Sequence, residues 1–240
     1  GGKGRSDVNI LMAVNPTTGH ILLVTTPRDF YVQLHGTTGL KDKLTHAGVW
    51  GVETSKATLE DLYGLPIDYY LRINFSSVIQ IVDLVGGVDV ENDQAFTSYV
   101  NQDYFFPAGM NHLDGDQALA FARERYSFAA GDRARGQNQA KVIAALIHKI
   151  AQPNILLRYN AVLDAVQGAV ETSVPPDQIT ALANQQLSQG TDWQIDTVSV
   201  NGSDASEPTF SYGSQRLYVM VPDMATVEAA AGRLHEVLER

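Results

Sequence analysis

The chain lacks cysteine altogether, has few basic residues and contains no long hydrophobic run. Without cysteine it forms no disulfide, no thiolate metal site and no cysteine nucleophile. No apolar segment approaches the roughly 18–20 residues that a membrane-spanning helix needs. Seventeen Lys and Arg stand against 27 Asp and Glu, a net charge of −10. This balance argues against the broad basic field of a nucleic-acid-binding protein, so we expect no nucleic-acid partner.

Several common catalytic motifs are also missing. The six histidines form neither an HxxxH nor an HExxH pattern, which argues against a zinc hydrolase. Ser76, Ser77 and Ser127 lack a GxSxG context, so a serine hydrolase has no support. The glycine-containing stretch "DLVGGVDV" is neither a P-loop nor a dinucleotide-binding motif, and we interpret it as a turn of the fold.

What is present is the composition of an ordinary globular protein, 44% hydrophobic and 18% charged. Segments rich in β-branched residues alternate with segments of helical spacing along the chain. The predicted helices include residues 53–65, 135–150, 155–170 and 176–187, and a serine-capped helix that begins at "SSVIQ". Residues 201–209 have the composition of a loop. The pattern predicts a single α/β domain over residues 1–240, with one mixed β-sheet and helices on both faces.

A β-hairpin is predicted near the start of the chain. Residues 7–14 and 20–27 are strand-like, and the "NPTTG" between them is dense in turn formers. If Val14 pairs with Ile21, paired residue numbers add up to 35, and Asp7 then faces Arg28. One interpretation is a cross-strand ion pair, worth well under about 1 kcal/mol if exposed. The other is a carboxylate that holds a divalent cation, preferably magnesium, against a phosphate, while Arg5 and Arg28 balance the charge.

A second cluster of positive charge lies in "LAFARERYS" and the residues that follow it. Arg123 and Arg125 are two positions apart, so both can point at one ligand only if the helix ends near Arg123. Arg135 and Gln139 are four apart and share a helical face. Guanidinium groups match phosphate oxygens bidentately, and glutamine adds a neutral donor. The alternative is a set of surface salt bridges to Glu124, Asp132 or Asp116.

Seven blocks of the sequence, taken in order, resemble the LytR–CpsA–Psr family. They are "RSDVNILMAVNP", "LLVTTPRDFYV", "DKLTHAG", "DYYLRINF", "VDLVGGVDV", "LDGDQALAFARER" and "GDRARGQNQ". The blocks run from Arg5 to Gln139, and the remaining chain is compatible with the C-terminal part of such proteins. The family consists of extracytoplasmic enzymes of mainly Gram-positive bacteria.

The resemblance implies a function. Members of the family are thought to transfer a glycan polymer from an undecaprenyl-pyrophosphate carrier to a cell-wall acceptor, usually peptidoglycan. The reaction breaks a phosphoanhydride and forms a phosphodiester. The protein is thereby expected at the extracytoplasmic face of the membrane, held by an anchor outside this chain. Two blocks look most similar to streptococcal capsule-attachment members, which favours capsular polysaccharide as the polymer.

The resemblance also implies roles for individual residues. The pyrophosphate-binding positions are matched by Arg28, Arg123, Arg125, Arg135 and Gln139. Asp7 matches an acidic residue that helps hold Mg²⁺, and we expect Asp7, Arg28 and Arg125 to be the catalytic residues. The general base stays open.

The lipid tail needs an apolar surface. Phe75, Ile79 and Val82 share a helical face that could line a tunnel for it, although residues at this spacing also form ordinary cores.

Two departures from the family pattern stand out. A second acidic metal ligand, expected on a strand upstream of "RSD", is not in this chain. Asn138 stands where many members carry a further arginine.

Two other functions use the same residues. A non-catalytic module would bind lipid pyrophosphate or anionic glycopolymer without turnover. A lipid pyrophosphate hydrolase would use water in place of a sugar hydroxyl.

Overall fold

The computed structural model describes residues 4–128, 131–158, 161–162, 164, 168 and 170–239. The chain divides into two compact units: unit 1 comprises Gly1–Tyr70 and Asp196–Arg240, and unit 2 comprises Leu71–Ile195. Each unit has its own hydrophobic core and contains both helices and strands. The predicted α/β class is therefore confirmed, whereas the assignment of the whole chain to one catalytic domain stays a prediction.

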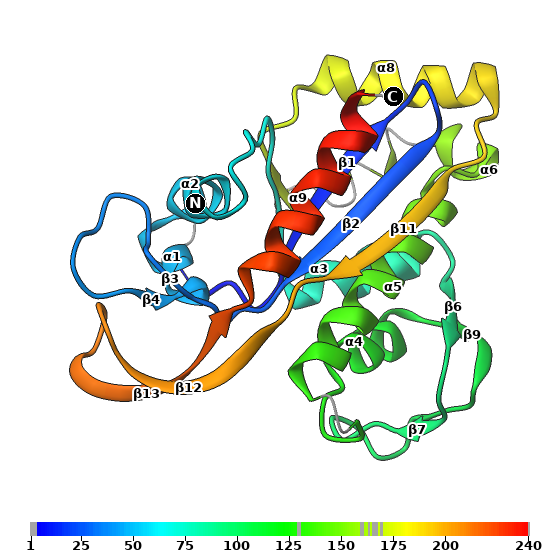
Figure 1. The fold of residues 1–240 in the computed structure, drawn as a ribbon. Helices are drawn as coiled ribbons and strands as arrows, with labels where there is room; N and C mark the ends of the chain where they lie inside the picture. Colours follow the sequence, from blue (N-terminus) through cyan, green and yellow to red (C-terminus); the bar gives the residue numbers. More distant parts are fainter. Residues whose placement is uncertain are drawn as a thin grey trace. The chain divides into compact units, whose positions relative to one another are not determined.

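Unit 1 is built from the two ends of the chain. Its elements are β1 (Asn9–Asn15), β2 (His20–Thr26), β3 (Tyr31–Val32), β4 (Asp42–Lys43), α1 (Leu44–Trp50), α2 (Val52–Tyr63), most of β11 (Gln194–Ser199), β12 (Gly202–Thr209), β13 (Gly213–Pro222) and α9 (Met224–Glu239). Figure 1 shows α9 lying along β1 and β2. Buried residues of this helix, among them Val227 and Leu234, pack with Leu22 and Val24 of β2 to form the core.

The predicted hairpin is present, in the predicted register. Antiparallel pairing of β1 with β2 runs from Asn9 opposite Thr26 to Asn15 opposite His20, so paired residue numbers add up to 35. On the other side of β2 lies β11. The His20 Nε2 atom is 3.0 Å from Asp196 Oδ2, and the Val200 N–H donates to the Thr25 carbonyl at 3.2 Å. Because these contacts advance together along both strands, β11 runs parallel to β2 and the three-stranded sheet is mixed.

The loop predicted for residues 201–209 is instead strand β12. It pairs with β13 in a two-stranded ribbon, from Gly202 opposite Pro222 to Pro208 opposite Arg216 (Figure 1). Its own residues are mostly polar and weak strand formers, but the partner strand supplies Tyr218, Val219 and Val221, and pairing overrides local propensity. A backbone bond from the Met220 N–H to the Asp29 carbonyl, 2.8 Å, attaches the ribbon beside the end of the hairpin.

Unit 2 combines helices with short strands. Its elements are β5 (Leu71–Ile73), α3 (Phe75–Leu84), β6 (Val88–Asn92), β7 (Phe96–Thr97), β8 (Phe105–Phe106), β9 (Gly109–Leu113), α4 (Gly115–Arg123), α5 (Asp132–Ile150), α6 (Pro153–Leu156), β10 (Val170–Thr172) and α8 (Pro176–Gln189). Its core centres on Phe96, Phe106 and Phe121, whose rings contact one another at centroid distances of 5.0–5.4 Å.

Several predicted boundaries in unit 2 change. The cap of α3 is Asn74, whose side chain accepts from the Ser77 N–H at 2.8 Å, and not a serine. Of the helix predicted over residues 155–170, residues 155–156 lie in the single turn α6 and residues 161, 162 and 164 are helical, whereas residue 170 begins β10. Residues 159–160, 163, 165–167 and 169 of that prediction lie outside the described residues.

The strands do not join into the one sheet predicted. Among the described residues they form the three-stranded sheet of unit 1 and five two-stranded sheets. Three of these five sheets are built from strands of only two or three residues, which offer few backbone groups to a further strand. The Gly86–Gly87 pair forms the turn between α3 and β6, and its φ angles of 81° and 83° favour glycine.

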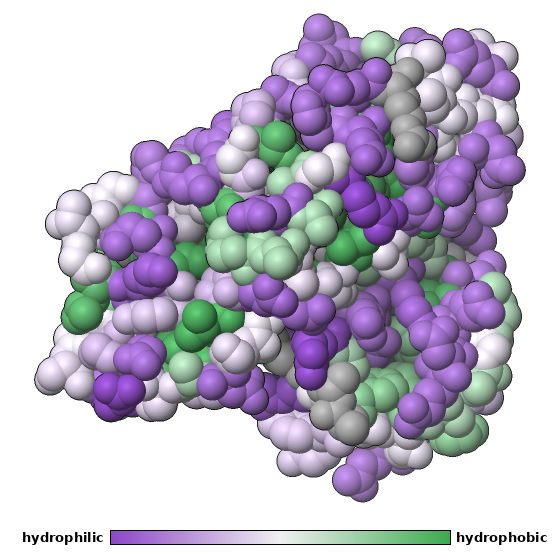
Figure 2. Space-filling model, in the orientation of Figure 1, coloured by the Kyte–Doolittle hydropathy of each residue, from purple (hydrophilic) through white to green (hydrophobic). Residues whose placement is uncertain are grey.

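The visible surface is mainly hydrophilic, with hydrophobic side chains in scattered patches (Figure 2). Within the described part of the chain, no helix combines the length and the hydrophobicity that crossing a bilayer requires.

Candidate functional site

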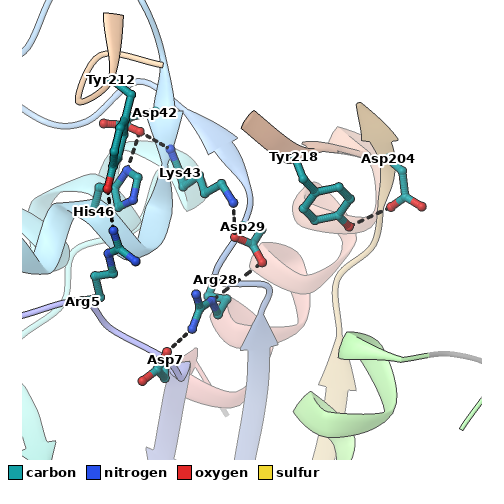
Figure 3. A network of polar contacts seen from close by, with 10 residues as sticks. All are labelled: Arg5, Asp7, Arg28, Asp29, Asp42, Lys43, His46, Asp204, Tyr212 and Tyr218. Atoms are coloured by element: carbon teal, nitrogen blue, oxygen red, sulfur yellow. Dashed lines mark hydrogen bonds and ion pairs between the residues drawn. The ribbon is translucent and has the colours of Figure 1, made fainter. Parts of the chain in front are cut away.

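The open end of the hairpin brings Asp7 and Arg28 together, as the register predicts (Figure 3). Arg28 follows β2 and donates from Nη1 to the Asp7 carboxylate. Its Nε also lies 3.7 Å from an oxygen of Asp29. The Arg28 side chain is 25% exposed and that of Asp7 is 41% exposed, so both can be reached from solvent.

Lys43 extends this contact into a row of alternating charges, which we call the hairpin-end cluster: Asp7, Arg28, Asp29 and Lys43. The Lys43 Nζ lies 2.9 Å from Asp29 Oδ1, and both side chains are only 15% exposed. The same Nζ lies 5.5 Å from the centroid of the Tyr218 ring. Sequence reasoning missed Lys43, although it stands inside the quoted block "DKLTHAG".

Asp42 lies beside this cluster, and its side chain is completely buried. Its Oδ1 contacts the Lys43 N–H at 2.8 Å and His46 Nδ1 at 2.6 Å. Its Oδ2 accepts from the Ser211 N–H at 2.9 Å and from the Ser211 hydroxyl. Burial by itself raises the pKa of Asp42, but the bonds from His46, Ser211 and Lys43 outweigh burial and lower it. The carboxylate thus joins the start of α1 to the turn between β12 and β13.

That turn carries Tyr212 toward the beginning of the chain. The Tyr212 ring lies 5.5 Å from the His46 ring, and its hydroxyl accepts from Arg5 Nη2 at 2.6 Å (Figure 3). Arg5, which the sequence places beside Asp7, is therefore directed by the β12–β13 turn.

In unit 2, helix α4 ends at Arg123, as required if both arginines of "RER" are to serve one ligand. Glu124 has extended backbone angles, φ −66° and ψ 132°. Arg123 lies 4.9 Å from the Phe75 ring centroid, and Arg125 lies 4.4 Å from that of Tyr126. Both arginines are exposed.

The acidic residue between these arginines is buried, which the sequence did not indicate. The Glu124 carboxylate accepts backbone N–H groups from Tyr99, Arg125, Tyr126 and Ser127. Burial alone raises the pKa of Glu124, but these four bonds lower it below its ordinary value. The side chain of Asp132, another suggested salt-bridge partner, lies outside the described part of the structure.

Helix α5 carries Arg135 and Gln139, both half-buried, in the arrangement the spacing predicts. Asn138, where many family members have arginine, is 6% exposed and donates to the Phe121 carbonyl at 3.3 Å. This side chain therefore helps to hold α5 against α4.

The three residues predicted to line a lipid tunnel differ in exposure. Phe75 is 40% exposed beneath Arg123, whereas Val82 is completely buried in the core of unit 2. Ile79 is half-buried, and its backbone lies so close to Gly115 that a Cβ there would meet the Ile79 carbonyl oxygen at 2.4 Å. Val82 fits the alternative of ordinary core, and the tunnel stays a prediction.

The metal prediction rests on one carboxylate. Among the described residues, no group of three or more His, Asp or Glu side chains is arranged to hold a metal ion. The hydroxyls of Ser6 and Thr45 are buried and have no hydrogen-bond partner in the described part of the chain. Thr45 is bonded through its backbone to Ser6 and to Arg28, so both hydroxyls belong to the surroundings of Asp7. Magnesium commonly takes one or two carboxylates with phosphate and water oxygens, and these residues fit such a site.

Comparison with known proteins gives the family. The sequence model of the LytR_cpsA_psr family matches residues 1–226. The chain belongs to the LytR–CpsA–Psr family. This match includes all of unit 2, most of unit 1 and every predicted site residue, and confirms the resemblance drawn from the seven sequence blocks.

Several proteins that are similar to this chain have names that state an activity. The chain is 42% identical over 179 residues to the polyisoprenyl-teichoic acid–peptidoglycan teichoic acid transferase TagU of Bacillus cereus, covering 74% of this chain and 57% of that protein. It is 34% identical over 218 residues to TagU of Enterococcus faecalis, covering 86% and 71%. The chain thus spans little more than half the length of the Bacillus relative.

The fold agrees with solved structures. Bacillus subtilis TagV superimposes with a TM-score of 0.79 and 30% sequence identity, covering 98% of this chain and 90% of that one.

Proposed function

We propose that the protein transfers a glycopolymer from a polyprenyl-pyrophosphate carrier to peptidoglycan, as a phosphotransferase at the extracytoplasmic face of the membrane. The names of its relatives, which specify a polyisoprenyl-linked polymer and a peptidoglycan acceptor, support both partners. The observation that carries the proposal to this chain is the Asp7–Arg28 contact, built by the hairpin in the register that the sequence predicts.

In this reaction an acceptor hydroxyl oxygen attacks the phosphorus that carries the glycan. The new phosphate ester forms as the bond to the polyprenyl phosphate breaks. The hydroxyl proton passes to a general base. Such displacements depend mainly on alignment and on stabilising the negative charge of the transition state. We propose that Arg28 of unit 1 supplies such stabilisation, and that in unit 2 the exposed Arg123 and Arg125 and the half-buried Arg135 and Gln139 do the same.

The hairpin-end cluster supports a role for magnesium. Its two carboxylates and two cations give a formal charge of zero, so the cluster alone offers no net attraction to a pyrophosphate diester with two negative charges. We propose that Mg²⁺ is held by Asp7 and phosphate oxygens, with the Ser6 and Thr45 hydroxyls nearby. Bound there, the ion would supply positive charge to the phosphate oxygens.

The polymer is the finer part of the proposal. The names of the relatives support a teichoic acid, whereas the capsular polysaccharide favoured by the sequence stays a prediction. We further propose that the lipid tail lies on the surface that includes Phe75, which is exposed, whereas Ile79 is half-buried and Val82 is buried.

A transfer assay tests the proposal. The full protein is incubated with a polyprenyl-pyrophosphate-linked glycan and a peptidoglycan fragment, with magnesium or with a chelator. Teichoic acid and capsular donors are run in parallel. We expect a glycan–peptidoglycan product that requires magnesium and is lost in Arg28→Ala and Arg125→Ala. Arg216→Ala, which removes a side chain that is 60% exposed and paired with Glu207, serves as the control.

Three results contradict the proposal. Retention of the lipid without any product would indicate a binding module, and release of free glycan phosphate without the acceptor would indicate a hydrolase. Full transfer by both arginine variants would remove these side chains from the site.

A further inference from the structure

The turn that follows α4 buries a negative charge at an unusual place. Glu124 is completely buried, although Arg123 and Arg125 on either side of it are exposed. Removing a carboxylate from water is unfavourable unless hydrogen bonds replace those of water. The contacts of Glu124 therefore indicate what its burial achieves.

One oxygen of Glu124 organises its own turn. Oε1 accepts the backbone N–H groups of Arg125, Tyr126 and Ser127, three consecutive residues, at 2.9, 2.8 and 3.1 Å. Successive N–H groups that converge in this way form a concave anion site. Here the anion belongs to the chain itself, so the segment 125–127 is wound around the carboxylate that precedes it.

The other oxygen fixes a second segment. Oε2 accepts the Tyr99 N–H at 2.5 Å. The same two segments meet again where the Ser127 hydroxyl donates to the Thr97 carbonyl at 2.9 Å, and where the Tyr99 and Tyr126 rings lie 4.4 Å apart. The carboxylate therefore joins residues 97–99 to residues 124–127.

These contacts lead to Arg125. The Arg125 guanidinium lies 4.4 Å from the Tyr126 ring centroid and donates to the Tyr126 hydroxyl. Tyr126 is held by its own N–H bond to Glu124 and by Tyr99, whose N–H is bonded to the other oxygen. The placement of the guanidinium thus depends on the Glu124 carboxylate through two tyrosines.

We propose that Glu124 is a positioning residue for phosphate recognition, because its carboxylate fixes the turn and the tyrosine pair that orient Arg125. This inference rests on the proposed function only in taking Arg125 as a pyrophosphate contact. An oriented guanidinium binds two phosphate oxygens without first losing rotational freedom, which is how preorganisation raises affinity. The ionised form is required, because a carboxylate accepts at both oxygens whereas an amide does not.

The competing explanation is that Glu124 only stabilises the fold. Glu124→Gln separates the two. Its amide oxygen can keep the bonds to residues 125–127, while its NH₂ group would face the Tyr99 N–H and lose that bond. If Glu124 only stabilised the fold, Glu124→Gln would lower the melting temperature and leave the phosphate affinity of the folded protein unchanged.

The test is a double-mutant cycle on binding of farnesyl pyrophosphate, measured by calorimetry well below the melting temperature. The proteins are wild type, Glu124→Gln, Arg125→Ala and the double variant. Asp93→Asn is the control, since its carboxylate is 81% exposed and pairs with Lys141. Near-ultraviolet circular dichroism checks that each variant is folded, and Glu124→Asp, which keeps the charge, is added in case Glu124→Gln does not fold.

We expect Glu124→Gln to weaken binding about tenfold, Arg125→Ala to weaken it at least as much, and the double variant to bind like Arg125→Ala. Glu124→Asp should bind more tightly than Glu124→Gln. Wild-type affinity in folded Glu124→Gln, fully additive effects in the double variant, or no binding of the probe by the wild type would each overturn the proposal. The transfer assay on the same proteins decides the proposed function separately, since coupled binding can occur without transfer.

Discussion

Replacing Asp42 by alanine should destabilise unit 1 strongly while removing very little volume. The carboxylate is completely buried and receives four hydrogen bonds, from the Lys43 N–H, the His46 ring, and the N–H and hydroxyl of Ser211. Ser211 is 169 residues away in sequence, so the lost contact is one that joins the two halves of the unit.

The magnitude follows from these bonds. Each hydrogen bond to a charged group contributes about 1.5–3 kcal/mol net, and the four are not additive because they share one carboxylate. Removing one partner from a buried ionic contact typically costs about 3–5 kcal/mol, since the remaining donors stay buried. We therefore expect the free energy of unfolding to fall by about 3–5 kcal/mol, and the melting temperature by roughly 6–20 °C at about 2–4 °C per kcal/mol.

Chemical denaturation and calorimetry at neutral pH measure this loss. Asp204→Ala is the matched control, because Asp204 is exposed and accepts one bond, from the Tyr218 hydroxyl at 2.9 Å. Its loss should stay within about 1 kcal/mol. An Asp42→Ala variant as stable as the control would show that the buried contacts do not hold the ribbon turn to α1.

The Asp42 carboxylate also makes stability depend on pH, because its pKa is lower in the folded state than its ordinary value of 3.8. The stabilisation is therefore present at neutral pH and is lost as the pH falls through the folded-state pKa, which lies below 3.8. Melts from neutral pH to about pH 2.5 should show a shallower acid dependence in Asp42→Asn, and an unchanged slope would refute this. Arg28→Ala should reduce transfer by about 100-fold or more. It should change the free energy of unfolding by no more than about 1 kcal/mol, because the Arg28–Asp7 pair is partly exposed. A larger loss of stability would show that the Arg28–Asp7 contact is structural. Val82→Ala should cost about 2–4 kcal/mol without loss of bound lipid, whereas Phe75→Ala should reduce lipid retention with little effect on stability. Mass spectrometry of extracted lipid checks both, and the opposite pattern would contradict the assignment of Val82 to the core.

The hairpin and the end of α4 could be predicted because local rules determine them. A short turn between two apolar strands fixes the register, and the register alone brings Asp7 to Arg28. Likewise, two arginines separated by one residue serve one ligand only where a helix stops, and α4 stops at Arg123. In both places the information lies within about 20 residues of sequence.

The buried carboxylates could not be predicted in this way. Asp42 and Glu124 look like ordinary surface charges in the sequence, and their partners Ser211 and Tyr99 are distant along the chain. Strand β12 was missed for the same reason, because its polar residues form a strand only through pairing with β13. Where tertiary contacts override local preference, the pattern of residue types alone gives the wrong structure.

The discontinuity of unit 1 has a consequence for how the chain reaches its fold. Unit 2 is one continuous segment, whereas unit 1 needs residues from both ends. As the chain is synthesised, β1 and β2 emerge early, but β11 and the helix that covers the sheet come last. Until residue 211 is made, Asp42 has no partner from the ribbon turn. Contacts across such long separations form slowly, because a large loop must close first. Unit 2 can therefore complete its core before the hairpin of β1 and β2 packs against β11 and α9.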